Sequence, residues 1–125
     1  MDTEMHFEET DQWLIARLRG ALKITGFTAG YERIAIECKR AGKTKALVDM
    51  TGATIPLAVA DKFAMGKAAV VFAQAGIQVA VYGLPSQVDT GKIGELTAVN
   101  RGVNIRVFTD LDEAQTWLSG GGSKV

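Results

Sequence analysis

Apolar and polar positions alternate in some stretches of the chain and recur at helical spacing in others. Residues 5–7 and 13–18 have the pattern of two strands, separated by the polar residues 9–12, which are as many as a hairpin connection needs. In the second stretch the apolar residues Leu14, Ala16 and Leu18 alternate with Ile15, Arg17 and Arg19. We therefore expect an antiparallel pair of strands with one face turned to the core.

The rest of the chain alternates strands with helices. Unbroken apolar runs at residues 45–49 and 77–82 are typical of buried parallel strands, and residues 104–108 complete the strands. Helical spacing predicts helices over residues 28–42, 56–75, 86–101 and 110–118. Each helix begins with a suitable residue: Thr28, Pro56, Ser86 with Asp89, and Asp110 with Glu113.

The predicted order is thus β-β-α-β-α-β-α-β-α, an α/β fold. Strands that alternate with single helices form a mostly parallel sheet, and the N-terminal strand joins it antiparallel at an edge. With 125 residues, 47% of them hydrophobic, the chain suits one domain. We assign this domain to residues 1–119 and predict a flexible tail over residues 120–125, which are rich in glycine.

Charge argues against several classes of partner. Fourteen basic residues balance fourteen acidic ones, so we expect no nucleic-acid binding. Residues 2–11 are acidic and residues 17–45 mainly basic, which indicates two complementary neighbouring surfaces. Residues 68–88 carry no charge, but glutamines, glycines and a proline interrupt them, and we predict no membrane span.

Catalytic chemistry is poorly represented. The single histidine, His6, lies in the acidic first strand, and the single cysteine, Cys38, falls on the apolar side of a helix, where a thiol packs as a small hydrophobe. With one histidine and one cysteine only a carboxylate site is conceivable, and the acids do not cluster at ligand spacing after residue 11, so we expect no metal and no cofactor. Because His6 and Cys38 are far apart in the sequence, we expect that the protein is not an enzyme. One cysteine cannot form an internal disulfide and no apolar leader opens the chain, so we expect a cytoplasmic protein.

The segment DMTGATIP, residues 49–56, is the best candidate for a binding site. It follows a predicted parallel strand, beyond whose carboxyl end ligands bind in such sheets, and it combines hydroxyls, a carboxylate and a helix start. The candidate residues for a partner or ligand are Asp49, Thr51, Gly52, Thr54, Pro56 and Phe63. The alternative is that Asp49 and Thr51 only bond neighbouring backbone amides in a turn.

Two short motifs resemble a known group of bacterial proteins. LVDMTG at residues 47–52 is similar to the D-[LM]-[ST]-G turn of the SpoIIAA-like (STAS/SEC14) proteins, related in fold to the STAS anti-sigma-factor antagonists. The ending RVFTDLDEAQTWL at residues 106–118 is similar to their closing F-x-D-x-x-E-A-x-x-W-L. The resemblance implies strands in sequential order and a role in binding rather than catalysis. In STAS phosphoswitches an acceptor serine follows an Asp at the next helix start, whereas residues 55–59 here are IPLAV.

These observations predict a regulatory or protein-binding module of STAS type without the usual phosphoacceptor serine. Phosphorylation of Thr51 or Thr54 in its place is a conjecture. The alternative is a binding protein for a small apolar or lipid-like ligand, because the predicted helix over residues 57–75 is apolar on nearly every side. The same apolar surface would also suit a homodimer contact.

Overall fold

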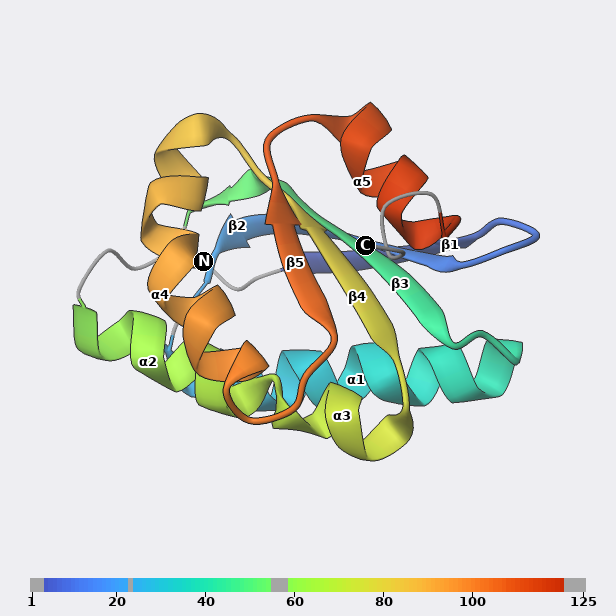
Figure 1. Cartoon of the computed structure of the whole chain (residues 1–125), viewed down its shortest axis with the longest axis horizontal. Coiled ribbons are helices and arrows are strands. Elements are labelled where there is room, and N and C mark those ends of the chain that lie inside the picture. Colours follow the sequence, from blue (N-terminus) through green and yellow to red (C-terminus); the bar gives the residue numbers. More distant parts are fainter. Residues whose placement is uncertain (1–3, 23, 55–58, 121–125) are drawn as a thin grey trace.

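The computed structural model of the chain describes residues 4–22, 24–54 and 59–120. Its centre is a five-stranded sheet with the strands in the order β1-β2-β3-β4-β5 (Figure 1). The strands are β1 (Glu4–Glu9), β2 (Leu14–Ala21), β3 (Lys45–Thr54), β4 (Gln78–Tyr82) and β5 (Ile105–Phe108). β1 runs antiparallel to β2, and every other pair is parallel. The predicted fold class is confirmed, including the sequential order and the antiparallel edge strand.

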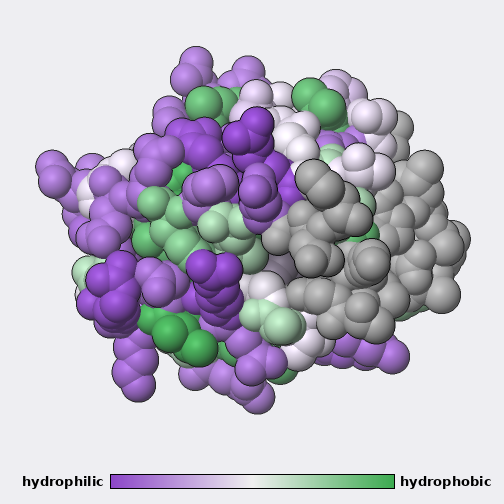
Figure 2. All heavy atoms as spheres, turned by 180° about the vertical axis from the view of Figure 1, so that it is seen from behind, coloured by the Kyte–Doolittle hydropathy of each residue, from purple (hydrophilic) through white to green (hydrophobic). Residues whose placement is uncertain are grey.

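The helices cover the two faces of the sheet unequally. They are α1 (Ile24–Ala41), α2 (Val59–Ala68), α3 (Val70–Ala75), α4 (Pro85–Val99) and α5 (Leu111–Leu118). The first four lie on one face and α5 lies alone on the other (Figure 1). Seen from behind, the surface is mainly hydrophilic, and its hydrophobic areas are small and separate (Figure 2).

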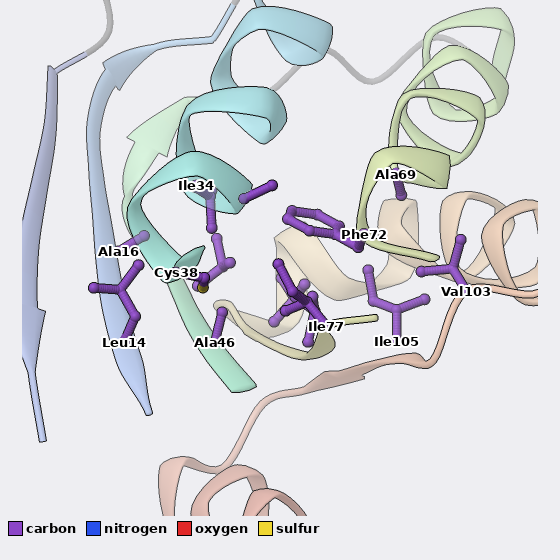
Figure 3. Close-up of a cluster of buried hydrophobic side chains, with 14 of the residues drawn as sticks. Leu14, Ala16, Ile34, Cys38, Ala46, Ala69, Phe72, Ile77, Val103 and Ile105 are labelled. Atoms are coloured by element: carbon purple, nitrogen blue, oxygen red, sulfur yellow. The ribbon is translucent and has the colours of Figure 1, made fainter. Parts of the chain in front are cut away.

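Two hydrophobic clusters hold these layers together. The larger one fills the space between the sheet and α1 to α4, with Leu14, Phe72 and Val79 fully buried. Ile34 and Cys38 of α1 point into it from one side (Figure 3). The smaller cluster joins Leu47 and Ala80 of the sheet to Trp117 and its neighbours on α5. Removing this apolar surface from water is the main force that stabilises the fold.

The hairpin explains the uneven charge of the chain. Thr10 Oγ1 accepts a hydrogen bond from Trp13 N at 3.0 Å and closes the turn. The acidic first strand then lies beside basic residues: Glu8 pairs with Arg17 at 2.7 Å, and Glu9 with Arg40 at 3.6 Å. The predicted complementary surfaces are confirmed.

Several predicted helix boundaries are wrong. α1 begins at Ile24, so Thr28 lies inside the helix and is not its N-cap. The predicted helix over residues 56–75 is two helices, because Ala69 begins a new helix and its carbonyl accepts the short i+3 hydrogen bond from Phe72 N. The last predicted start is confirmed, since Asp110 Oδ1 accepts from Glu113 N at 3.1 Å.

The third predicted helix start is also wrong. α4 begins at Pro85 after the N-cap Leu84, not at Ser86. The side chain that returns to the N-cap amide is Gln87, whose Oε1 accepts from Leu84 N at 2.7 Å, rather than Asp89. Proline suits the first helical position because the amide hydrogen that it lacks would have no partner there. Two other predictions, Pro56 as a helix start and the tail after Gly120, lie outside the described residues.

Candidate functional site

The predicted turn after residue 49 is a continuation of β3. This β3 extension, residues 50–54, pairs with β2, whereas the pairing of β3 with β4 ends at Asp49 and Tyr82. The register passes from Arg17 opposite Asp49 to Arg19 opposite Gly52, so one extra residue of β3 is inserted. Such a bulge bends a strand and redirects its side chains. The prediction of a strand-to-helix bend at residues 49–54 is therefore wrong, since these residues are strand.

The bulge decides which side chains of the β3 extension are buried. Met50 and Ala53, three positions apart instead of the usual two, both enter the larger cluster. Gly52 and Thr54 remain exposed. A Cβ atom on Gly52 would lie 3.1 Å from the carbonyl oxygen of Leu18, so the close approach to β2 suits glycine. The β3 extension thus presents a fixed polar surface at the carboxyl end of the parallel strands.

Gln87 occupies the open side of the β3 extension, where β4 no longer runs. Its Nε2 donates to Met50 O at 2.9 Å and to Ala53 O at 2.7 Å. Its Oε1 accepts from Leu84 N, so one buried amide connects the β3 extension to the start of α4. Gly83 leaves room for this arrangement, because a Cβ there would lie 3.1 Å from Gln87 Oε1.

Asp49 belongs to a network of polar side chains on the face of the sheet that carries α5. Its Oδ1 accepts from Thr51 N at 3.0 Å and from Thr51 Oγ1 at 2.7 Å. Its Oδ2 accepts from Arg17 Nη1 at 3.1 Å, and Arg17 also pairs with Glu8. The alternative interpretation of this pair holds only in part: Asp49 accepts from the Thr51 amide, but the Thr51 hydroxyl bonds Asp49 rather than a backbone amide and the segment is strand. The Asp49 carboxylate thereby stabilises the bulge, and Arg17 balances its charge.

The remaining predicted site residues lie in different places. Gly52 and Thr54 are on the β3 extension, and Pro56 lies outside the described residues. Phe63 is on α2, which packs against α4, and its side chain is 47% exposed. The structure brings Asp49, Thr51, Gly52 and Thr54 together on one strand, and Phe63 comes from the helix layer on the other side of the sheet.

The two residues with catalytic potential are kept apart. His6 is exposed on β1, opposite Arg17 in the register, while Cys38 is buried on the α1 side of the sheet. Burial, with a smaller contribution from Glu37, raises the pKa of the Cys38 thiol to about 11. A thiol with so high a pKa is a poor nucleophile near neutral pH. Within the described residues no group of three histidine, cysteine or acidic side chains is placed to hold a metal ion.

A small apolar cavity lies between the sheet and the helices α1, α2 and α4. Met50, Met65, Val81 and Ala98 contribute to its apolar lining, and Tyr31, Gln87 and Glu95 add polar atoms. Burial raises the pKa of Tyr31 to about 12. The cavity has a volume of about 40 Å³. That is room for one or two water molecules, whereas sites for small organic ligands measure about 300–1,000 Å³.

Three residues of this region were missed by sequence reasoning. Arg17 had a signal, because it is a basic residue at an outward position of a strand that is predicted to pair with the acidic first strand. Leu84, 46% exposed beside the β3 extension, and Gln87 had none. A lone glutamine in an uncharged stretch does not indicate that it bonds a strand more than thirty residues before it.

Comparison with known proteins concerns the fold. No family model matches the chain, and a search of curated proteins finds no match. Among solved structures, an anti-sigma factor antagonist from Mycobacterium paratuberculosis is 11% identical, with 94% of this chain and 95% of that one covered and a TM-score of 0.63. An uncharacterised protein of the DUF3478 family with a SpoIIAA-like fold, from Shewanella loihica PV-4, is 18% identical, with 93% of each chain covered and a TM-score of 0.55.

No helix within the described residues is long and apolar enough to cross a membrane.

The likeness to the two solved structures extends over nearly the whole chain and agrees with the strand order and the helix layers. It confirms the resemblance seen in the sequence: the chain has the SpoIIAA-like fold that the STAS anti-sigma-factor antagonists share.

Proposed function

We propose that this chain is a non-enzymatic regulatory module that binds a protein partner through the β3 extension and its surroundings. The observation that carries the proposal is the way in which residues 50–54 are held. A bulge, the Asp49 carboxylate and the Gln87 amide fix this segment without covering Gly52 or Thr54. A surface fixed before binding loses less conformational entropy when a partner binds.

The surroundings of the β3 extension suit a protein partner. Leu84, which Gln87 connects to the β3 extension, supplies an exposed apolar side chain, and Arg17 and Glu8 supply charges on the sheet face. An apolar contact within a polar rim is the usual composition of a protein interface. One of the two similar structures is named as an anti-sigma factor antagonist, a type of protein that acts by binding another protein.

Catalysis has little support. The pKa of Cys38 is raised and its thiol is buried in the larger cluster, whereas His6 lies between Met5 and Phe7, which pack against that cluster, and so belongs to the other face of the sheet. Residues 55–59 contain no hydroxyl that could replace the acceptor serine of a STAS phosphoswitch, so the proposed binding does not depend on phosphorylation there. The partner is expected in the cytoplasm.

The alternative, a carrier of a small apolar or lipid-like ligand, stays a prediction. It would require the cavity beside Tyr31 to expand from about 40 Å³ to the several hundred that such ligands need. Native mass spectrometry of the purified chain would support this alternative if a ligand remained bound.

The proposed function is tested with two matched arginine variants. Thr54→Arg places a large cation on the β3 extension, and Thr116→Arg places it on α5, at another exposed threonine. The wild type and both variants are immobilised, exposed to extract of the source cells, and the retained proteins are quantified by mass spectrometry. We expect at least one protein to be retained equally by the wild type and by Thr116→Arg. The amount of this protein retained by Thr54→Arg should be at least tenfold lower. Equal retention by all three would contradict the proposal.

A further inference from the structure

Helix α1 carries opposite charges at equal distances on either side of its centre. Ala35 and Ile36 lie at its centre, and Glu32 and Lys39 follow at equal distances on either side. Further out, Ala29 in the helix and Gly42, the residue directly after its end, are also equally distant from the centre. Glu32, Ile36 and Lys39 are exposed, and they occupy one side of the helix because their spacing is three or four residues.

This side of α1 forms one wall of the groove between α1 and α3. Ala35 and Ile36 line it from α1, and Val71 and Ala75 line it from α3. The groove has a volume of about 670 Å³. Ile36 is 63% exposed, an unusually large fraction for a branched apolar side chain in the middle of a helix. The groove therefore combines apolar lining residues from both helices with a largely exposed isoleucine.

Of the charged residues that line the groove, Lys43 is engaged within the chain, because its Nζ donates to Asp11 O at 3.1 Å. In the described parts of the molecule Glu32 and Lys39 have no ion-pair partner, and seven positions separate them on the helix. The arginines on the other side of Ile36 are already engaged. The guanidinium of Arg33 lies 5.2 Å above the Phe7 ring, and Arg40 pairs with Glu37 at 2.9 Å.

A second copy of this chain satisfies all these features. Two α1 helices can pack antiparallel about a two-fold axis that passes between Ala35 and Ile36. A residue that lies a given number of positions before this point then faces the residue that lies the same number of positions after it in the second copy. Glu32 of each copy then faces Lys39 of the other, twice, and each Ile36 enters the other copy's groove. Ala29 meets Gly42, and neither has a side chain large enough to keep the helices apart.

We propose that α1 is a self-association surface, with the α1 of a second copy of this chain as its partner and the two-fold axis between Ala35 and Ile36. This inference goes beyond the proposed function and uses a different surface, since none of these residues belongs to the β3 extension. The two ion pairs are at the rim of the interface, so association weakens as salt screens them.

Charge reversal tests this proposal without knowledge of any other partner. Glu32→Lys and Lys39→Glu each place two like charges opposite each other in the dimer. Sedimentation equilibrium of the full chain at low salt should show an association constant at least tenfold lower for either variant. The double variant Glu32→Lys/Lys39→Glu restores both pairs, and an equimolar mixture of the single variants forms a heterodimer, so both should recover association.

An apolar control separates this surface from general stickiness. Ile36→Ser should lower association at least tenfold, whereas Leu96→Ser on α4, where the side chain is 61% exposed, should not change it. Far-UV circular dichroism verifies that each variant is folded. A wild type that stays monomeric at every concentration, single reversals without effect, a double variant that fails to recover, or equal losses in both serine variants would overturn the proposal.

Discussion

The two halves of β3 lie on the same strand and are held by different means. Residues 45–49 pair with β2 on one side and β4 on the other, and Ala46, Leu47 and Val48 are buried. The β3 extension pairs with β2 alone, and a single glutamine side chain takes the place of β4. The first half is therefore part of the core, while the second is a surface whose shape depends on a few polar contacts. The candidate site belongs to the second half.

The largest effect on the free energy of unfolding is expected for a substitution in the first half of β3, residues 45–49. Leu47→Ala removes a side chain that is 2% exposed from the cluster under α5. The lost burial and the cavity left behind should lower the free energy of unfolding by about 2–5 kcal/mol. Urea unfolding followed by circular dichroism measures the loss. A loss below about 1 kcal/mol would show that the first half contributes less to the core than its burial indicates.

The next largest effect concerns the residue that holds the second half. Gln87→Leu leaves Met50 O, Ala53 O and Leu84 N without this partner, which should cost about 1–3 kcal/mol in the free energy of unfolding. Gln78→Leu is the matched control, because Gln78 makes one long side-chain bond of 3.4 Å to Trp117 O. Urea unfolding of both variants should show the larger loss for Gln87→Leu. Equal losses would contradict the role assigned to Gln87.

Two glycine substitutions should act in opposite directions. In Gly52→Ala the new Cβ would lie 3.1 Å from Leu18 O, and the shift of the bulge should cost about 1 kcal/mol or more. In Gly30→Ala on α1 the nearest atom is Met5 Cε at 3.5 Å, an ordinary contact, and higher helix propensity should add up to about 1 kcal/mol. Thermal unfolding of the two variants reports both signs. A higher unfolding temperature for Gly52→Ala would show that the bulge accommodates a Cβ atom without strain.

The smallest effect is expected for the charges beside the bulge. Arg17→Met removes the pairs with Glu8 and Asp49, and Arg17 is 46% exposed. Water and salt screen such exposed pairs, so the loss in the free energy of unfolding should stay below about 1 kcal/mol. The difference from wild type should shrink further in high salt. A loss that is large and independent of salt would place Arg17 in the core network instead.

The sequence predicted the first half of β3 and missed the second for a physical reason. An apolar run such as residues 45–49 indicates a buried strand by itself, because burial depends on the side chains of the run. Whether DMTGAT continues as strand depends on hydrogen-bond partners elsewhere: β2 on one side and Gln87, 37 residues from Met50, on the other. Local patterns contain no such information, and turn-forming residues such as Asp49 and Gly52 point the other way.

The helices show the same division between local and distant causes. The start of α5 was predicted correctly because Asp110 caps the helix with its own side chain. The break at Ala69 was missed, since an alanine-rich apolar stretch favours one continuous helix by propensity. In the candidate site, the bonding of Asp49 to Thr51 was foreseen as a local turn, whereas Arg17 reaches Asp49 from a neighbouring strand.

Gln87 holds the β3 extension separately from the core half of the same strand. Amide hydrogen exchange of the wild type and of Gln87→Leu, resolved by residue, measures this directly under conditions in which both are folded. We expect exchange of the paired amides in residues 50–54 to become at least tenfold faster in the variant, equivalent to about 1.4 kcal/mol. Residues 46–48 should keep their wild-type rates apart from the change in global stability. Equal acceleration in both halves, or none in residues 50–54, would contradict it.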